Sequence, residues 1–303
     1  MEIKKLFAWA MIALSLLAAC EKGSSEKEKE EGGQGTEGIT LGDIAGEWYM
    51  NLSENVSLIN ESLVINSNGS FVAEMTDSYE DQGRTIISSK VRIEGRFILD
   101  GTSITGDVTK AQRLNQNGEW ENTEMKPFGE NQKVSLLRNG TVLLLTYDYK
   151  EDYPDAPVKK GMEFYYRKGA TLPSDNSELQ GTWFWMDKYM SNDKEDIRIA
   201  LKFTGNNIDL IVAPWSQRFI CEYTYKDGFV SSKAPITFRT LWKRNGSNPL
   251  NPEDPYDSEW LPTYDPDQYR GNLTEDGFSF PIIVDGDTAY SMFLGLQEIY
   301  TKQ

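Results

Sequence analysis

The residues of this chain that are best suited to chemistry lie between Arg244 and Gly277. The segment holds five of the chain's twelve prolines, and this spacing predicts a long loop because proline interrupts both helices and sheets. Its aromatic residues, interleaved with carboxylates, are Tyr256, Trp260, Tyr264 and Tyr269. Aromatic rings give a large contact area and stack on the C–H faces of sugars, while carboxylates accept hydrogen bonds from hydroxyls. The segment is therefore a candidate glycan site, with Trp215 and Trp242 as secondary candidates.

Other interpretations of this loop stay open at the sequence level. Tyr256, Trp260 and Tyr264 would also suit a lid that folds back over one end of a barrel, or the seam between two halves of the chain. Asp254 and Glu259 would suit the acid pair of a hydrolase. Asp265 and Asp267 would suit a calcium site, although the further ligands of an EF-hand loop do not follow them.

The absence of histidine narrows the range of reactions that the chain could catalyse. Histidine is the commonest general base and the commonest metal ligand, and it activates the nucleophile in Ser-His and Cys-His pairs. We therefore expect no catalytic residues, no metal site and no cofactor.

Cys221 lies in a segment of alternating character, where Phe219, Cys221, Tyr223 and Tyr225 would share one face of a strand. A thiol among aromatic residues behaves as a small core hydrophobe. We expect it to be buried and unreactive.

The chain contains one unit written twice, as two matching stretches indicate. Gly46-Glu47-Trp48 corresponds to Gly181-Thr182-Trp183 at an offset of 135 residues. Near the ends of the copies, Phe164 to Lys168 is aligned with Glu298 to Lys302 at an offset of 134, which sets Thr301 opposite Arg167.

Each copy is predicted to be a series of short strands joined by tight turns. Asn68-Gly69, Asn139-Gly140 and Asp285-Gly286 are taken as type I′ hairpin turns. Strands of the first copy are expected near residues 46–51, 61–66, 70–76, 87–98, 102–109, 132–138, 141–148 and 162–168. Their order favours two tandem eight-stranded up-and-down β-barrels in an all-β protein, with a pair of Greek-key sandwiches as the alternative.

The N-terminus has the pattern of an export signal. Lys4 and Lys5 precede an apolar run, and the small residues Ala18-Ala19 stand directly before Cys20. The run is too short to span a bilayer. Residues 21–38 contain no hydrophobic residue and predict a flexible acidic linker. The expected parts are a signal peptide (1–19), a linker that begins with Cys20 (20–38), a first barrel (39–170) and a second barrel (176–303) with the loop 244–277.

These motifs resemble those of two known groups of proteins. The segment ending in Cys20 resembles the lipobox of bacterial lipoproteins, which implies a lipidated Cys20 and a membrane anchor. The two Gly-x-Trp motifs, with basic residues on the last strands, are similar to the lipocalin-like domains of Bacteroides-type lipoproteins. That resemblance implies that Trp48 and Trp183 close one end of each barrel beneath basic residues of the last strands, namely Arg167 or Lys168 in the first copy and Lys302 in the second. Separately, Asp287-Thr288-Ala289 resembles the short O-glycosylation site of exported proteins in Bacteroides-type bacteria, which makes Thr288 a candidate for modification.

Charge limits the partners of the chain. Removal of residues 1–19 would take away Lys4, Lys5 and Glu2, leaving 29 basic and 46 acidic residues, so nucleic acid should be repelled. The expectation is an outer-membrane lipoprotein, periplasmic or on the cell surface, that binds a small apolar molecule or a glycan without catalysis. The alternative is an assembly subunit of an envelope complex that docks on a protein through residues 249–270.

Overall fold

The computed structural model describes most of the chain beyond the N-terminal region. The described residues are 38–54, 57–81, 84–115, 117–123, 130–150, 158–188, 195–213, 216–243, 246–247, 250–251, 253–262, 277–293 and 298–303. The predicted signal peptide and Cys20 lie outside them. The chain divides into two compact units between Ala170 and Thr171, and each is described by itself.

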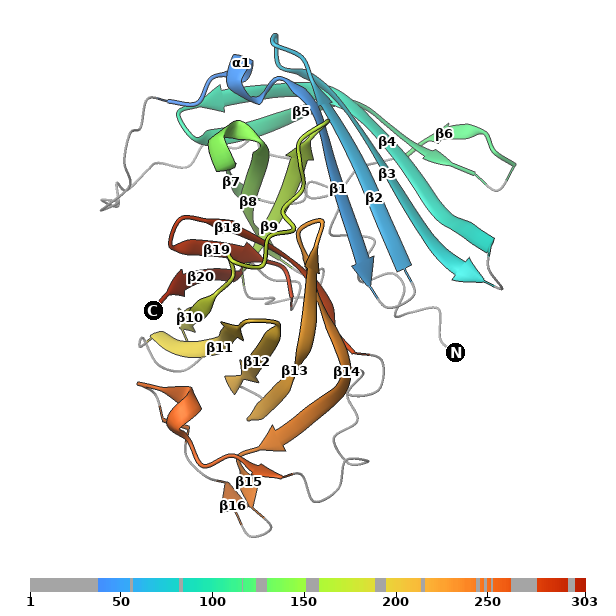
Figure 1. The fold of residues 1–303 in the computed structure, drawn as a ribbon. Helices are drawn as coiled ribbons and strands as arrows, with labels where there is room; N and C mark the ends of the chain where they lie inside the picture. Colours follow the sequence, from blue (N-terminus) through green and yellow to red (C-terminus); the bar gives the residue numbers. More distant parts are fainter. Residues whose placement is uncertain are drawn as a thin grey trace. The chain divides into compact units, whose positions relative to one another are not determined.

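The first unit is a ring of antiparallel strands (Figure 1). Its elements are α1 (Leu41–Ile44), β1 (Gly46–Glu54), β2 (Ser57–Ile65), β3 (Ser70–Asp81), β4 (Arg84–Asp100), β5 (Ser103–Leu114), β6 (Trp120–Asn122), β7 (Glu130–Leu137), β8 (Val142–Lys150) and β9 (Val158–Arg167). Strands β1 to β5 pair in sequence, β7 to β9 do the same, and β9 returns to β1. The pairing between β5 and β7 consists of the single residue pair Ser103 and Lys133.

The second unit is a closed eight-stranded antiparallel barrel with the same order of neighbours. Its barrel strands are β10 (Gly181–Lys188), β11 (Glu195–Thr204), β12 (Asn207–Val212), β13 (Gln217–Lys226), β14 (Phe229–Thr240), β18 (Ser279–Asp285), β19 (Thr288–Ser291) and β20 (Glu298–Lys302). Three two-residue strands precede β18: β15 (Trp242–Lys243), β16 (Gly246–Ser247) and β17 (Leu261–Pro262). The last of these pairs with β14, so the proline-rich segment is not wholly loop.

The prediction of an all-β protein is confirmed, and the strands follow one another around each ring. In a Greek key a long connection would return one strand to lie beside a non-sequential neighbour, and neither ring shows this order. The predicted strands of the first copy are present but mostly longer, as β4 shows, and β6 was not predicted.

The predicted type I′ turns are wrong at two of the three sites. A type I′ turn needs positive φ at both central residues. In the connection 66–69 only Gly69 has positive φ, so the turn there is not type I′. In the turn 138–141 the Thr141 N–H donates to Arg138 O, and the central residues Asn139 and Gly140 have φ of 55° and 79°, so the type I′ prediction is confirmed there. Gly286 is the first central residue of its turn because Asp285 still belongs to β18. The sequence Asp227-Gly228, with φ of 55° and 81°, meets the type I′ requirement.

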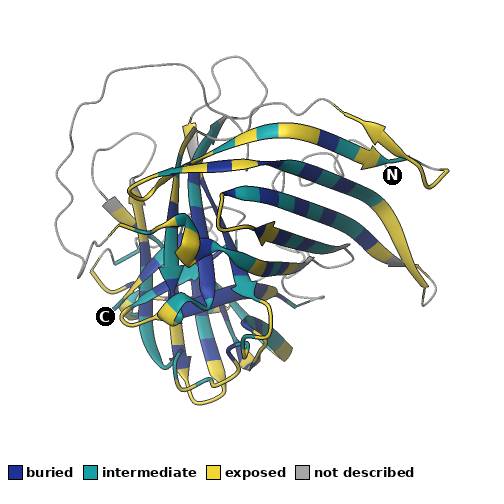
Figure 2. Cartoon of the chain, turned by 90° about the horizontal axis from the view of Figure 1, so that it is seen from above, coloured by how far each residue is buried: buried dark blue, intermediate teal, exposed yellow. Residues whose placement is uncertain are grey.

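Most inward-facing side chains of the described strands are buried in each unit. Figure 2 shows the alternation along the long strands of the first unit as bands of buried and less buried residues. Phe71 and Phe97 stack there with centroids 4.2 Å apart. Phe71 lies over Gly95, where an added Cβ would come within 2.8 Å of the ring, so this interior position requires glycine.

The two ends of each ring differ in the length of their connections. At the end where β1 begins, the first unit has the turns 66–69, 101–102 and 138–141; at the other end it has the connections 55–56, 82–83, 115–129 and 151–157. The second unit has two-residue turns at one end and its longer connections, including the span from β14 to β18, at the other. The longest connections of each ring are therefore at the end away from the first residues of β1 and β10.

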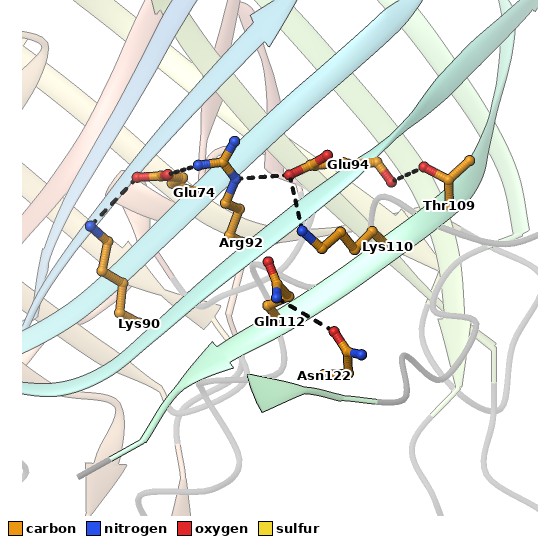
Figure 3. A network of polar contacts seen from close by, with 8 residues as sticks. All are labelled: Glu74, Lys90, Arg92, Glu94, Thr109, Lys110, Gln112 and Asn122. Carbon is orange, nitrogen blue, oxygen red and sulfur yellow. Dashed lines mark hydrogen bonds and ion pairs between the residues drawn. The ribbon is translucent and has the colours of Figure 1, made fainter. Parts of the chain in front are cut away.

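The outer face of β3, β4 and β5 carries a row of alternating charges (Figure 3). Glu74 contacts Lys90 at 3.5 Å and Arg92 at 3.3 Å, and Glu94 contacts Arg92 at 3.1 Å and Lys110 at 3.9 Å. Because these side chains are about one third to one half exposed, each pair contributes little to stability. The row is a solvated face that favours the observed strand register.

No helix among the residues described here is long and apolar enough to cross a lipid bilayer.

Candidate functional site

A tryptophan and an arginine close one end of the first ring. Trp48 is fully buried, and its Nε1–H donates to the carbonyl of Ile44 at 2.8 Å. The Arg167 Cζ lies 4.3 Å from the centroid of the indole. Its guanidinium also donates to the carbonyls of Asp43, Ala45 and Gly140. One side chain thus joins the last strand to the residues preceding β1 and to the turn between β7 and β8.

The second unit has the same arrangement with lysine. Trp183 is fully buried and donates to Leu179 O at 2.7 Å, and Lys302 Nζ lies 5.0 Å from its ring. Register pairs Trp48 with Arg167 and Trp183 with Lys302. The offset is therefore 135 at the end of the repeat as well as at its start.

The expected equivalence of Thr301 with Arg167 is wrong. A one-residue shift along a strand moves each side chain to the opposite face of the sheet. The offset of 134 therefore aligned inward-facing residues of one copy with outward-facing residues of the other. Lys168, the other candidate, points away from Trp48 and pairs with the exposed Glu47 at 2.5 Å. That contact lowers the pKa of Glu47, chiefly through the hydrogen bond from Lys168.

The glycines of the two Gly-x-Trp motifs are required by this closure. Gly46 has φ of 144° and Gly181 has φ of 117°, which side-chain-bearing residues rarely adopt. An added Cβ would lie 3.0 Å from Arg167 Nη1 in the first ring and 3.0 Å from Lys302 Cε in the second. The motif therefore supplies both the bend and the space for the basic side chain.

We predict that Arg167→Leu destabilises the first unit by about 2 kcal/mol, because the cation–π contact and the hydrogen bonds to three carbonyls are lost. Arg167→Lys, which copies the second ring, should have roughly half that effect. The measurement is hydrogen exchange of β1 and β9 peptides in the full chain. Lys168→Ala is the control and should leave their protection unchanged; an equal effect of both variants would contradict the assignment.

The described part of the proline-rich segment packs on the outer wall of the second barrel. Ala200 and Ile211, paired across β11 and β12, face away from the interior. They form a cluster with Ile197, Leu241 and Trp260, which we call the wall cluster, and Phe184, Leu250 and Tyr256 pack against it. Trp260 is 7% exposed, and its Nε1–H donates to Pro255 O at 3.0 Å. Its ring is not available for stacking on a sugar.

Tyr256 is held by the wall as well. Its hydroxyl donates to Asp209 O at 2.9 Å, and burial raises the pKa of that hydroxyl. The Arg218 guanidinium lies 5.4 Å from the Tyr256 ring and pairs with the Asp209 carboxylate through two hydrogen bonds, at 2.8 and 2.6 Å. Lys202 Nζ lies 5.3 Å from the same ring. Tyr256 therefore joins the segment to β11, β12 and β13.

A shallow polar hollow lies beside this contact. It measures about 180 Å³ and is lined by Lys202, Thr204, Asn207, Ile208, Asp209 and Ile220. Pockets that hold drug-sized ligands usually measure about 300–1,000 Å³. The hollow is too small to bury more than a single ring.

The remaining predicted site residues carry less information. Tyr264, Trp215, Asp265 and Asp267 lie outside the described residues, as does the side chain of Trp242. Asp254 accepts a hydrogen bond from the Tyr256 N–H at 2.9 Å, the role of a cap on a short helical turn.

Cys221 and Thr288 lie on strands of the second barrel. Cys221 is buried, and burial raises the pKa of its thiol to about 11. Thr288 begins β19 and is partly exposed. Among the described residues, no three acidic, cysteine or histidine side chains are grouped closely enough to hold a metal ion.

We predict that Trp260→Ala destabilises the second unit by about 3–5 kcal/mol, because it empties part of the wall cluster. Faster exchange of β11 and β12 peptides in the full chain would show this. Asp257→Ala, at an exposed position of the same segment, should change stability by less than about 0.5 kcal/mol. Unchanged protection in Trp260→Ala would contradict the packing described here.

Two buried glutamates lie inside the first ring and were not predicted from the sequence. Glu61 of β2 is 2% exposed and Glu163 of β9 is fully buried. The Tyr165 hydroxyl lies 2.9 Å from Glu61 Oε1 and 2.9 Å from Glu163 Oε2. The Tyr147 hydroxyl lies 3.2 Å from Glu163 Oε1. Tyr147 can reach Glu163 because its ring lies across Gly161, where an added Cβ would come within 2.3 Å of the ring.

The two contacts of the Tyr165 hydroxyl require that Glu61 or Glu163 is protonated. The Tyr165 hydroxyl has one hydrogen and can donate it to one carboxylate only. The other carboxyl must be protonated to make a hydrogen bond to the same oxygen. In agreement, burial and the neighbouring Glu163 raise the pKa of Glu61 well above its usual value. Burial also raises the pKa of Tyr165.

The motif Glu-x-Tyr-x-basic could have indicated this cluster. Glu163, Tyr165 and Arg167 recur as Glu298, Tyr300 and Lys302 at the corrected offset of 135. In the second barrel the Tyr300 hydroxyl donates to Glu298 Oε2 at 2.9 Å, and the Phe293 N–H donates to the same oxygen at 3.1 Å. Each ring thus holds a buried acid and a tyrosine above its closed end, and the first ring adds Glu61.

We predict that the stability of the first unit falls, relative to Glu61→Gln, as the pH rises above about 4.5, the ordinary value for glutamate. Above that pH the unfolded chain releases the Glu61 proton while the folded chain keeps it, so rising pH favours unfolding by up to about 1.4 kcal/mol per pH unit. The effect continues until the raised folded pKa is reached. The measurement is hydrogen exchange of β2 and β9 peptides at several pH values, with the second unit as internal reference. A difference between the proteins that does not change with pH would show that Glu61 is ionised in the folded chain.

Neither a protein-family model nor a curated protein sequence matches the chain.

Proposed function

We propose that the chain is a lipid-anchored, non-catalytic binding protein of a bacterial outer membrane, composed of two tandem lipocalin-like barrels. The anchor is assigned to Cys20 on the strength of the lipobox resemblance. The barrel assignment rests on the indole beneath a basic residue in each ring. The first ring is proposed to bind the ligand.

The observation that carries the binding function is the buried Glu61. It lies inside a ring whose one end is closed by Trp48 and Arg167, and its Oε2 has no hydrogen-bond partner among the described residues. A buried polar atom without a partner destabilises the fold, so its presence calls for an explanation beyond folding. Recognition of a ligand would supply one.

A small molecule is favoured over a glycan. The glycan hypothesis relied on Tyr256, Trp260 and Tyr264, and the first two are engaged by the wall of the second barrel. The polar hollow beside Tyr256 has a small volume for a sugar.

The second candidate function is assembly on a protein partner. The surface that favours it is the hairpin of β3 and β4, and not the segment 249–270. The hairpin of β3 and β4 exposes Tyr79 (39%), Ile86 (37%) and Ile87 (56%) near its tip. Such exposed apolar side chains are typical of interaction sites. The described aromatic residues of segment 249–270 pack on their own barrel instead.

We predict that the full chain, purified from membranes, carries a covalent acyl mass that survives denaturation and a non-covalent small-molecule mass that does not. Native and denaturing mass spectrometry of one sample measures both. A Cys20→Ser variant should lack the acyl mass. A wild-type chain without the acyl mass would overturn the anchor, and a bound polypeptide in place of a small molecule would overturn the binding function in favour of assembly.

A further inference from the structure

A comparison of the two rings shows which buried residues the closed end of a ring requires. In the first ring Trp48 pairs with Leu63, and Met50 pairs with Glu61. In the second ring Trp183 pairs with Leu201, and Trp185 pairs with Ile199. The closed end is therefore the same in both copies. At the next inward-facing position along the second strand of each ring, the first copy has Glu61 and the second has Ile199.

An acid at this position is not needed to build the ring. Ile199 is fully buried in the core of the second barrel and packs there with Trp185. The neighbouring acid of that barrel, Glu298, accepts hydrogen bonds from both Tyr300 and the Phe293 N–H. The second barrel therefore closes with one buried acid at this place, and the first ring has a second one, Glu61, that closure does not require.

The residues paired with Glu61 on the adjacent strands are apolar, and Tyr165 and Glu163 are its polar neighbours. Its paired neighbours on the adjacent strands are Met50 and Met75, which are 1% and 5% exposed. Oε1 is engaged with the Tyr165 hydroxyl. Oε2 is buried and has no partner among the residues that the structure describes. It can accept a hydrogen bond, or donate one when it carries the proton.

The chemistry of the cluster selects the ligand. Glu61, Glu163 and Tyr165 offer acceptor oxygens, and the cluster is neutral or negative in every protonation state. A ligand hydroxyl would form a hydrogen bond with the unpartnered Glu61 Oε2. A protonated amine would form the same bond and would also neutralise the charge of a carboxylate. A carboxylate ligand would meet like charge in a place shielded from water.

We propose that Glu61 is the polar anchor of a ligand site inside the first ring, and that the ligand is a small apolar molecule that carries a hydroxyl or an amine. The inference rests on the proposed binding function and adds the class of ligand. The apolar neighbours contact the body of the molecule, and Glu61 Oε2 contacts its polar head. The second barrel has Ile199 and Trp185 at the equivalent positions, so no acid corresponds to Glu61 there.

The test compares three probes that share a tail and differ in the head group: 1-octanol, octylamine and octanoate. They are titrated calorimetrically into the full chain in lipid nanodiscs. The wild-type chain should bind octanol and octylamine at least roughly tenfold more tightly than octanoate, the size expected for one hydrogen bond to a charged or buried polar group.

Two variants separate a binding role from a structural one. Glu61→Ile copies the second ring and should lose the preference for octanol and octylamine while the first unit keeps or gains thermal stability. Glu61→Gln keeps an acceptor oxygen and should retain octanol binding but weaken octylamine binding. Ser291→Ala removes a buried hydroxyl of the second barrel whose Oγ has no partner among the described residues, and it should change neither affinity.

Equal affinity of the wild-type chain for all three probes would overturn the inference. So would a Glu61→Ile variant that loses stability but keeps the head-group preference, because Glu61 would then serve only the fold. If the wild-type chain binds none of the probes, the class of ligand is wrong. A small molecule found with the purified chain by mass spectrometry would in that case leave the binding function standing.

Discussion

Contact between a buried indole and a basic side chain holds both rings of this chain closed. The contact joins the last strand to the first, and in the first ring it extends through Arg167 to the carbonyls of Asp43, Ala45 and Gly140. Because Trp48 and Trp183 each face one position on the last strand, the contact also favours a single register of pairing. Every inward side chain above the closed end depends on that register.

The register explains why the same three residue types share one face of the last strand. Glu163, Tyr165 and Arg167 all point inward, as do their counterparts in the second barrel. The basic residue makes a cation–π contact with the indole, and the tyrosine hydroxyl makes a hydrogen bond with the buried acid. Glu61 enlarges this arrangement in the first ring, where two carboxyls and one phenol share protons in a place shielded from water. A second buried acid raises the free energy of the fold, so we interpret it as a binding residue.

Much of the frame could be predicted from the sequence. Alternation along the strands and the two Gly-x-Trp motifs indicated a repeated all-β unit with sequential strands, because these signals are local. The offset between copies was misjudged at the end of the repeat, since Lys168 and Lys302 align as well by residue type as Arg167 and Lys302 do. Only strand pairing distinguishes them. The turn type at Asp285-Gly286 was wrong for a related reason, because Asp285 belongs to the strand and not to the turn.

The candidate site could not be predicted, because it depends on contacts that are distant in sequence. Glu61 and Tyr165 are 104 positions apart, and nothing near Glu61 marks it as inward-facing and buried. The opposite error affected Trp260. Its aromatic, proline-rich surroundings are typical of a binding loop, but the barrel presents Ile197, Ile211 and Leu241 on its outer wall, and the segment covers them. An apolar outer wall is not visible in strand alternation until the strands are placed.

The closure of the rings can be tested by NMR of the full chain labelled with ¹³C-lysine. With Lys302 Nζ 5.0 Å from the centroid of Trp183, the ring current of the indole should move the side-chain methylene resonances of this lysine upfield. Lys302→Arg should remove the displaced resonances, and Lys168→Arg should leave them in place. Displaced resonances that vanish with Lys168→Arg, or none that depend on Lys302, would contradict the closure on which the structure depends.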